Sequence, residues 1–270
     1  MNPVEAHYTR GNLLETILDA LRAAGKDLAH LSPDDLAAVD EFHSGQRRTT
    51  IRLAKLLALT GKERVLDVGS GLGGPARFLA SSYGCRVSGV DLCAEFCRVA
   101  EALTQLTGLQ GRVDFRQADA LDLPFADQSF DVLWSQNTAM NIRDRDRLYR
   151  EMRRVLVPGG RLGLQEIALG PAGAPYYPVP WAREAALSFL FSPEETRGKL
   201  EAAGLRVLLW QESNEPSSLA APRRPAAGGP SVLGTHLILG AEWRAMAENT
   251  ARNREERRIQ PFDAVLERVD

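Results

Sequence analysis

Cysteine is scarce in this sequence, with three in 270 residues: Cys85, Cys93 and Cys97. An odd number of cysteines without a recognisable secretory leader indicates free thiols in a reducing compartment rather than a disulfide framework. Cys93 and Cys97 are four residues apart, so a helix would bring them to one face. Because no second Cys or His pair lies near them to complete four ligands, we expect packing residues and no metal.

Long hydrophobic runs are missing too. No apolar stretch approaches the roughly 18 residues needed to span a bilayer. The first residues, MNPVEAHYTRG, contain an acid and lack the apolar segment of a signal peptide. The net charge is only −2, so nothing indicates a nucleic-acid partner or binding to an anionic membrane. We therefore expect a cytoplasmic protein. Only four of its 33 basic residues are lysine, a bias typical of GC-rich bacterial coding.

Apolar segments of two periodicities alternate from residue 64 onward, and they predict strands and helices in turn. Alternation of this kind predicts right-handed crossovers and a doubly wound, mostly parallel α/β sheet. Pro261 favours an edge position, or the start of its strand. The expected strands are 64–68, 85–92, 112–119, 130–136, 161–168, 205–212 and 259–269, and the expected helices are 73–83, 94–108, 145–160, 192–204 and 237–257.

The first sixty residues differ from the alternating part, since they predict helices at 11–25, 31–40 and 42–59. We therefore expect a helical preface over 1–60 and a core domain over 61–270. Two segments interrupt the core pattern, a Pro- and aromatic-rich stretch at 169–191 and a segment at 213–257 that begins with a loop rich in Pro, Ser and Ala. We expect these two segments to form a lid.

A glycine-rich turn follows the first expected strand. Residues 65–74 read VLDVGSGLGG, with Gly69, Gly71 and Gly74 in the G-x-G-x-x-G order of dinucleotide-binding loops. Glycines let the backbone approach a ligand, and the start of the next helix adds free N–H groups. The pattern alone fits two ligands, NAD and S-adenosylmethionine, because both would bind at the carboxyl ends of the strands.

Three acids help to separate these ligands. Asp67 at the mouth of the turn repels a pyrophosphate and attracts the ammonium and sulfonium groups of S-adenosylmethionine; the alternative is that it binds N–H groups of its own turn. Asp91 ends the second strand, where it can accept hydrogen bonds from both ribose hydroxyls of either ligand. Asp119 can accept one from the adenine amino group, with Ala120 leaving room for the ring; the alternative is a turn or helix cap.

In combination, VLDVGSGLGG, GVDL, ADALDLPF, SFDVLWSQ and MRRVLVPGGRL, which cover 64–168, resemble the class I S-adenosylmethionine-dependent methyltransferases. The resemblance is strongest to small-molecule enzymes such as the sarcosine/dimethylglycine, phosphoethanolamine, ubiquinone/menaquinone and natural-product sugar O-methyltransferases. It implies a seven-stranded Rossmann-like sheet with an antiparallel last strand, which suits 259–269. It also implies S-adenosylmethionine as cofactor, with Asp67, Gly69, Gly71 and Gly73 around the methionine part, Asp91 on the ribose, Leu92, Asp119 and Ala120 at the adenine, and Ser135 and Gln136 beneath the sulfonium.

Residues for the methyl acceptor are harder to identify, because methyl transfer needs alignment and exclusion of water more than a strong base. The resemblance places His43 and Gly45 near the methyl donor and Tyr8 over the site. His43 is the candidate to position or deprotonate a substrate, with packing as the alternative. Relatives carry an acid and a His where this sequence has Asn137 and Asn141. That departure disfavours a cationic amine substrate, although both Asn residues can orient a substrate by hydrogen bonding.

The expected lid over 169–191 supplies aromatic side chains. Tyr177 and Trp181 are candidate substrate residues, and Tyr176, Phe189 and Phe191 add aromatic surface. Such a lid favours an apolar or aromatic substrate, while binding of a cation by the rings is the competing use and ordinary packing the remaining alternative.

The expected function is transfer of a methyl group from S-adenosylmethionine to O, N or C of a small molecule. We expect a monomer or homodimer without nucleic-acid or membrane partners. An NAD-dependent oxidoreductase is the first alternative, disfavoured by Asp67 and by the lack of a Tyr-x-x-x-Lys pair. A non-catalytic protein of the same fold that binds S-adenosylmethionine is the second.

Overall fold

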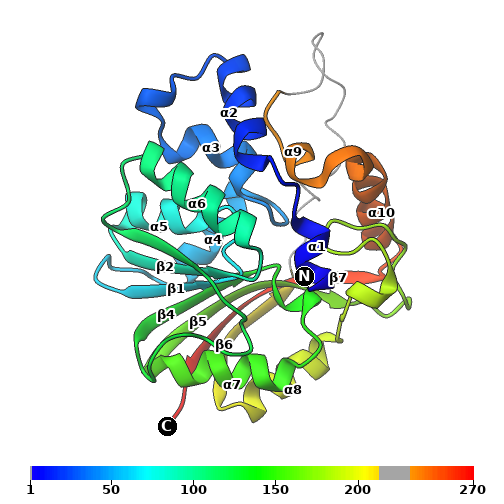
Figure 1. Cartoon of the computed structure of the whole chain (residues 1–270). Coiled ribbons are helices and arrows are strands. Elements are labelled where there is room, and N and C mark those ends of the chain that lie inside the picture. Colours follow the sequence, from blue (N-terminus) through cyan, green and yellow to red (C-terminus); the bar gives the residue numbers. More distant parts are fainter. Residues whose placement is uncertain (1, 213–231) are drawn as a thin grey trace.

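A computed structural model describes residues 2–212 and 232–270. Its centre is a seven-stranded sheet in the order β3-β2-β1-β4-β5-β7-β6 (Figure 1). Six strands share one direction, and β7 runs antiparallel to its neighbours β5 and β6. The predicted fold class, including the antiparallel last strand, is confirmed. The strands are β1 Arg64–Val68, β2 Arg86–Asp91, β3 Val113–Gln117, β4 Phe130–Gln136, β5 Leu156–Leu169, β6 Leu205–Glu212 and β7 Ile259–Arg268.

Helices cover both faces of the sheet: α4, α5 and α6 lie on one side and α7 and α8 on the other (Figure 1). The α-helices of the described residues are α1 Pro3–Tyr8, α2 Leu13–Ala23, α3 Pro33–Asp40, α4 Arg47–Leu56, α5 Gly74–Tyr83, α6 Ala94–Leu106, α7 Arg145–Val155, α8 Pro193–Ala202, α9 His236–Leu239 and α10 Trp243–Glu255. Short 3-10 helices add η1 Leu28–His30, η2 Ala139–Asn141, η3 Ala185–Leu187 and η4 Gly240–Glu242.

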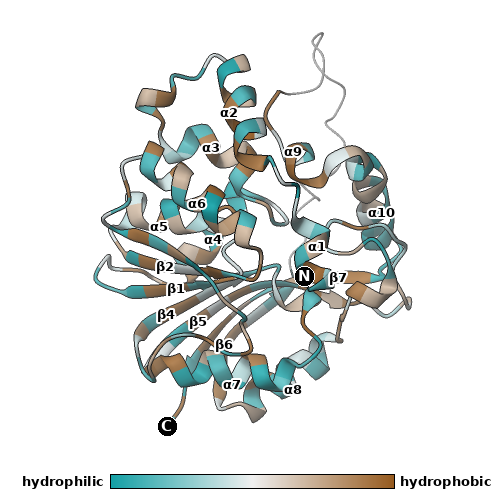
Figure 2. Ribbon diagram, in the orientation of Figure 1, coloured by the Kyte–Doolittle hydropathy of each residue, from teal (hydrophilic) through white to brown (hydrophobic). Residues whose placement is uncertain are grey.

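The central strands are apolar because both faces of the sheet are covered. In β1, Val65 packs with the side chains of α4 and α5, whereas Leu66 and Val68 pack with those of α7. Figure 2 shows the corresponding hydrophobic colouring along the strands. The burial of both faces leaves the carboxyl ends of the strands as the place where polar side chains reach a ligand.

The expected preface packs onto the core rather than standing apart from it. Leu13, Ile17 and Leu21 of α2 share an apolar cluster with Phe96 and Val99 of α6. The expected boundary between 1–60 and 61–270 stays a prediction, and residues 213–231 of the expected lid lie outside the described residues.

Three expected helices have different bounds in the structure. The helix expected at 42–59 begins only at Arg47, because 41–46 form a loop. The helix expected at 145–160 ends at Val155, and 156–160 belong to β5; Pro158 disfavours helical backbone at the residue before it. The helix expected at 237–257 is divided at Gly240, whose φ of +73° interrupts helical geometry.

Of the two positions expected for Pro261, the edge of the sheet is wrong, since β7 lies between β5 and β6, and the start of its strand is confirmed. Pro261 is the third residue of β7 and pairs with Ile167 of β5. Within the described residues, β6 pairs with β7 only from Phe262 onward. Pro261 therefore lies beyond that pairing, where its missing N–H costs no bond to β6.

Candidate active site

A cavity of about 490 Å³ opens at the carboxyl ends of β1, β2 and β4, under α1 and the segment 180–189. It gathers residues from one end of the sequence to the other. Thirteen of the candidate residues line it: Tyr8, His43, Asp67, Gly69, Gly71, Asp91, Leu92, Asp119, Ala120, Gln136, Asn137, Asn141 and Trp181.

Four candidate residues do not line this cavity. The Ser135 hydroxyl donates to the Val68 carbonyl oxygen at 3.0 Å inside the sheet. Gly73 packs against Phe115, and Gly45 packs against Thr49, so tightly that a Cβ at either position would clash. Tyr177 belongs to an apolar cluster beneath the lid. These four residues shape the surroundings of the cavity.

Asp67 is the most unusual polar group at the cavity. Its residue is 2% exposed, and its Oδ2 is buried without a hydrogen-bond partner among the described residues. Burial, reinforced by the nearby carboxylates of Asp91 and Glu41, raises the pKa of Asp67 well above its ordinary value. To ionise in this position, the acid needs a donor or a cation from outside the chain.

The glycine turn does not supply that donor. The N–H groups of Gly69 and Ser70 both donate to the Val90 carbonyl oxygen, at 2.8 and 3.0 Å. The Gly71 N–H donates to Asp91 Oδ2 at 2.9 Å. These N–H groups of the turn therefore bind Val90 and Asp91, and not Asp67 as the alternative required.

Asp91 joins the glycine turn to the start of α6. Its Oδ1 accepts from the Cys93 N–H at 2.9 Å, while Oδ2 accepts from Gly71. Burial raises the pKa of Asp91, and these backbone N–H groups oppose the rise. Each carboxylate oxygen has a second lone pair, so the clamp leaves room for ligand hydroxyls.

Asp119 closes a turn, which was the alternative to adenine binding. Its Oδ1 accepts a hydrogen bond from the Leu121 N–H at 2.9 Å. The residue is exposed and still lines the cavity. Leu92 and Ala120 add apolar side chains to the lining of the same cavity. Turn formation and ligand contact are compatible here, because Asp119 Oδ2 takes no part in the turn bond.

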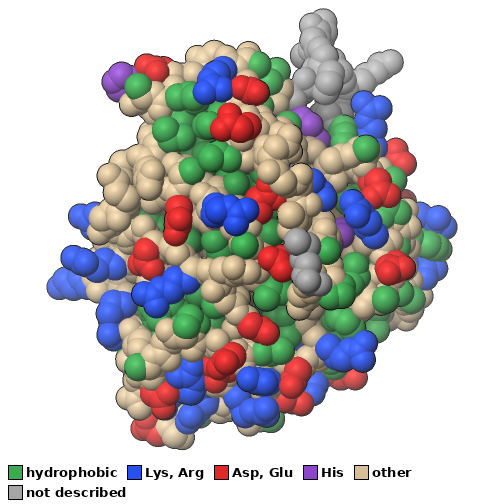
Figure 3. Space-filling model, viewed as in Figure 1, with side chains coloured by type: hydrophobic (Ala, Val, Ile, Leu, Met, Phe, Trp, Pro, Cys, Tyr) green, Lys and Arg blue, Asp and Glu red, His purple; other side chains and the backbone are tan. Residues whose placement is uncertain are grey.

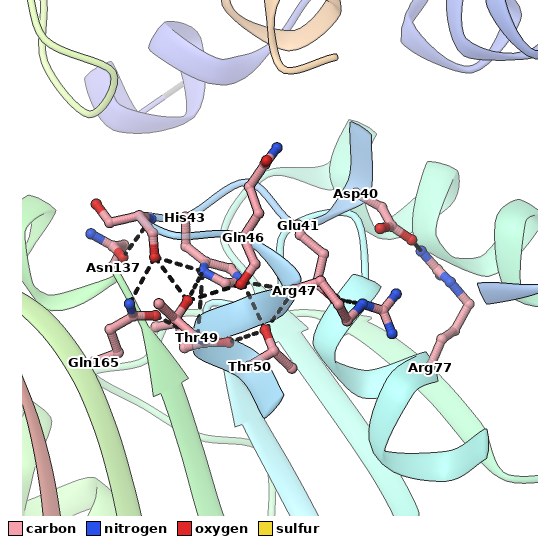
Figure 4. Close-up of polar contacts among 12 residues, drawn as sticks. Asp40, Glu41, His43, Gln46, Arg47, Thr49, Thr50, Arg77, Asn137 and Gln165 are labelled. Atoms are coloured by element: carbon pink, nitrogen blue, oxygen red, sulfur yellow. Dashed lines mark hydrogen bonds and ion pairs between the residues drawn. The ribbon is translucent and has the colours of Figure 1, made fainter. Parts of the chain in front are cut away.

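A buried polar network anchors the loop before α4 (Figure 4). His43 Nε2 lies 2.8 Å from Glu41 Oε2, and the Thr50 hydroxyl donates to the same oxygen at 2.5 Å. Arg47 Nε lies 2.7 Å from Glu41 Oε1. Burial opposes the charge on Glu41, but hydrogen bonding by His43 and the charges of His43 and Arg47 hold the pKa of Glu41 below its usual range.

His43 faces the protein with both ring nitrogens. Its Nδ1 lies 3.3 Å from the Thr49 hydroxyl and 3.4 Å from Gln136 Nε2, while Nε2 faces Glu41 and Thr50. This geometry agrees with the packing alternative for His43 and gives it no nitrogen free to act as a base.

The same loop is fastened to the ends of β4 and β5. Asn137 Oδ1 accepts from the Ser44 N–H at 3.3 Å, and Gln165 Nε2 donates to the Ser44 carbonyl oxygen at 2.7 Å (Figure 4). Asn137 adopts a φ of +54°, which Asn tolerates better than most residues. The loop and the strand ends therefore form one floor for the cavity.

Asn141 joins the N-terminal helix to the lid. It accepts a hydrogen bond from the Tyr8 hydroxyl at 2.9 Å. Its Nδ2 donates to the carbonyl oxygens of Trp181 and Leu187 at 2.7 and 3.1 Å. The amide of Asn141 thus holds three segments together.

Of the lid aromatics, only Trp181 and Phe189 line the cavity. The Trp181 indole N–H donates to the Ser188 hydroxyl at 2.9 Å. Tyr176 instead lies against the guanidinium groups of Arg252 and Arg258, at 3.8 and 4.2 Å. The lid is therefore fixed partly by aromatic contacts that do not reach the cavity.

Sequence reasoning missed two acids at the site: Glu41, which bonds to the cavity residue His43 without lining the cavity itself, and Glu5, which lines it. Glu41 was within a stretch singled out for His43, but its role depends on Arg47 and Thr50, which only the fold brings to it. Glu5 in α1 was missed because six residues give a weak helical pattern.

The three cysteines are buried free thiols. No group of three or more His, Cys, Asp or Glu side chains in the described ranges is arranged to hold a metal.

Across 2–212 and 232–270, no helix is both long and apolar enough to cross a membrane. On the face in Figure 3, basic and acidic side chains are interspersed.

Residues 66–164 match the model of a methyltransferase domain family. Methyltransferase GfsG of Streptomyces halstedii is 37% identical over 161 residues, which are 59% of this chain and 58% of that protein. The chain thus spans little more than half the length of that curated relative.

Solved structures share the fold over most of the chain. The [4+2]-cyclase SpnF has a TM-score of 0.65 at 24% identity, covering 96% of this chain and 94% of its own. Geranyl diphosphate C-methyltransferase from Streptomyces coelicolor A3(2), solved with S-adenosyl-L-homocysteine, has a TM-score of 0.65 at 20% identity, covering 82% of this chain and 79% of its own.

Residues 66–164 therefore match a methyltransferase domain, and the chain has the fold of the class I S-adenosylmethionine-dependent methyltransferases, as the sequence motifs predicted. The fold alone does not fix the reaction, because a cyclase shares it. The reaction has to be argued from the cavity.

Proposed function

We propose that the chain binds S-adenosylmethionine in this cavity and transfers its methyl group to a small-molecule acceptor. The observation that carries the proposal is the buried, unpartnered Oδ2 of Asp67 beside the glycine turn. An amino-acid ammonium group would supply both the missing donor and a compensating charge.

The other residues of this half fit the rest of the same cofactor. Asp91 keeps lone pairs for ribose hydroxyls, since each oxygen accepts one backbone N–H. Asp119 Oδ2 and the small Ala120 suit an adenine amino group and ring, and the apolar Leu92 lines the same cavity. When bound, the cofactor supplies a methyl group activated by a positively charged sulfur.

The chain's own task is then to align the acceptor and exclude water. α1 and the segment 180–189 cover the cavity, and the Asn141 hydrogen bonds hold them together. His43 serves as a positioning residue for the cavity floor rather than as a base, because both its nitrogens face protein groups. A monomeric or homodimeric state, the absence of a nucleic-acid partner and a cytoplasmic location remain predictions.

The NAD-dependent alternative fits the cavity less well. A pyrophosphate at the glycine turn would lie near the carboxylates of Asp67 and Asp91, and the repulsion would be strong at low exposure. No basic side chain comes from the turn itself, which reads GSGLGG. The described residues therefore favour a ligand that is cationic at this point.

Calorimetric titration with S-adenosylhomocysteine and, in parallel, NAD tests the proposal. We expect S-adenosylhomocysteine to bind with a Kd of about 1–100 μM and NAD not to bind. Asp67→Asn should weaken binding about tenfold or more, the equivalent of losing one charged contact. Asp19→Asn, which makes the same change at an exposed acid of α2, is the control. Binding of NAD alone would overturn the proposal; binding of S-adenosylhomocysteine without turnover on any acceptor would favour a non-catalytic protein.

A further inference from the structure

The order of the strands divides the cavity into two halves at the switch point between β1 and β4. The acids Asp67, Asp91 and Asp119 stand at or just after the ends of β1, β2 and β3. The ends of β4 and β5 contribute the uncharged Asn137 and Ile167. We call the half formed by the ends of β4 and β5, η2 and 180–189 the acceptor compartment.

The walls of the acceptor compartment are apolar. Met140 and Ile167 are each 4% exposed and Trp181 is 2% exposed, so these side chains are packed among other protein groups. The apolar side chains that line it are Met140, Ile142, Ile167, Trp181, Leu187 and Phe189. Such walls gain free energy from an apolar ligand and provide nothing to solvate an ion.

The remaining acids that line the cavity are directed elsewhere. Asp40 is paired with Arg77 at 2.7 Å, with both side chains fully buried. Glu5 accepts from Gln117 on the β3 side, at 3.4 Å. Asp144 is exposed and caps the start of α7. Each of these carboxylates therefore already has a partner within the protein.

Glu166 lies near the compartment without lining it. Its Oε1 accepts from the N–H groups of Thr138 and Ala139, at 3.1 and 3.0 Å, beneath η2. Burial raises the pKa of Glu166, and the Arg145 guanidinium opposes that rise. Glu166 Oε1 therefore holds the backbone of η2, and Oε2 is buried without a hydrogen-bond partner among the described residues, outside the cavity lining.

The two amides of the compartment are engaged as well. Asn141 has its oxygen on Tyr8 and its Nδ2 on two carbonyl groups of the lid. Asn137 Oδ1 accepts from the Ser44 N–H. At the rim, the Arg143 guanidinium lies 4.8 Å from the centre of the Phe189 ring. A positive charge already occupies that ring, which disfavours a second cation there.

We propose that the acceptor is an uncharged, largely apolar molecule lying against Trp181 and Phe189, and not a cationic amine. This inference rests on the proposed function, because it identifies the acceptor half by the place of the cofactor half. A cationic amine in the acceptor compartment would lose its hydration and find no carboxylate to pair with among the described residues that line it.

The experiment compares two probes of one shape, 1-naphthalenemethanol and 1-naphthalenemethylammonium, by calorimetry at pH 7 with and without saturating S-adenosylhomocysteine. We expect the alcohol to bind about tenfold or more tightly than the ammonium, a difference of about 1.4 kcal/mol. Asn137→Asp should narrow this ratio by introducing a carboxylate. Asp keeps the acceptor for the Ser44 N–H and tolerates the φ of Asn137. Gln105→Glu, on the exposed side of α6, is the matched control and should leave the ratio unchanged.

Equal or tighter binding of the ammonium would overturn the inference, as would failure of both probes to bind. An unchanged ratio in Asn137→Asp would also overturn it, because the missing carboxylate would then not be the cause. Failure of S-adenosylhomocysteine to bind, with the alcohol still preferred, would instead overturn the proposed function while leaving the apolar compartment established.

Discussion

The hydroxyl of Tyr8 donates a hydrogen bond to Asn141 Oδ1 at 2.9 Å, across 133 residues of sequence. The bond joins α1 to η2 at the rim of the cavity, and Asn141 continues it to the lid through two carbonyl oxygens. Burial raises the pKa of Tyr8, so the phenol remains protonated and available as a donor at neutral pH. One amide thus couples the N-terminal helix to the cover of the cavity.

Substitution of these two residues should therefore have unequal effects. Tyr8→Phe removes one hydrogen bond and should lower the free energy of unfolding by about 1 kcal/mol. Asn141→Leu also leaves two lid carbonyl groups without their donor and should cost about 2–4 kcal/mol. Urea unfolding measures both values, and limited proteolysis within 169–191 reports loosening of the lid. Equal losses would show that Asn141 acts only through Tyr8.

Asp67→Asn should stabilise the protein in the absence of ligand. The variant removes a buried carboxylate whose Oδ2 has no partner, and such a group costs about 1–3 kcal/mol. Because the folded-state pKa of Asp67 is raised, wild type pays no penalty below the ordinary value of 3.8 and loses stability as pH rises through the raised pKa. The advantage of the variant should grow over the same interval. Thermal unfolding at several pH values tests this, and an advantage that does not change with pH would contradict it.

The same raised pKa predicts proton release on cofactor binding. An ammonium group beside Asp67 favours its ionised form, so a proton held by the free protein leaves when the ligand binds. The calorimetric enthalpy of S-adenosylhomocysteine binding should then depend on the ionisation enthalpy of the buffer at pH values below the raised pKa. This dependence should be lost in Asp67→Asn and kept in Asp19→Asn. Retention of the full dependence in Asp67→Asn would assign the proton to another group.

Glu41 should contribute stability above its ordinary pKa of 4.5, because its folded-state pKa is lowered. Glu41→Leu removes the buried carboxylate that both His43 and Arg47 contact and should cost about 3–5 kcal/mol. Glu41→Gln preserves the shape and should cost less. As pH falls below 4.5 through the lowered pKa, wild type loses this contribution and the gap to Glu41→Gln should shrink. Urea unfolding between pH 3 and 7 measures the gap, and a constant gap would show that the charge of Glu41 contributes nothing.

The sheet was predictable because its strands carry local signals. The run before the glycine turn and the later alternation of strands and helices depend only on periodicity. The antiparallel insertion of β7 into the sheet could be predicted only through the family resemblance, because no local pattern in residues 259–268 indicates the direction of the strand or its neighbours. The position of Pro261 inside the sheet depends on where β6 ends its pairing, which is a property of the assembled sheet.

The cavity was predictable where a residue directly follows a strand, as for Asp67 and Asp91. It was less predictable where side chains bond across long separations. Asn141 was expected to orient a substrate, but its amide is occupied by Tyr8 and the lid. His43 was expected near the methyl donor, and only the fold reveals that Glu41 and Gln136 occupy its surroundings.

Two glycines of the turn should respond differently to an added methyl group. Gly69 has a φ of +78°, and a Cβ there would lie 2.1 Å from Thr138 Oγ1. Gly69→Ala therefore combines backbone strain with a clash against a side chain that holds the Val68 carbonyl, and should cost about 3 kcal/mol or more. Gly71 has a φ of +53° with nothing within 4 Å, so Gly71→Ala should cost only about 1–2 kcal/mol of strain.

Gly71 lines the cavity. The two variants should therefore differ in ligand binding as well as in stability. Gly71→Ala should keep the fold, by circular dichroism and urea unfolding, yet bind S-adenosylhomocysteine about tenfold or more weakly, since the methyl occupies space that a close backbone approach requires. In Gly69→Ala, by contrast, the loss of stability should be the main effect, and any loss of binding should follow from it. If Gly71→Ala binds as wild type does, the ligand does not approach this part of the turn, and the cofactor half of the cavity would have to lie closer to Asp119 than to Asp67.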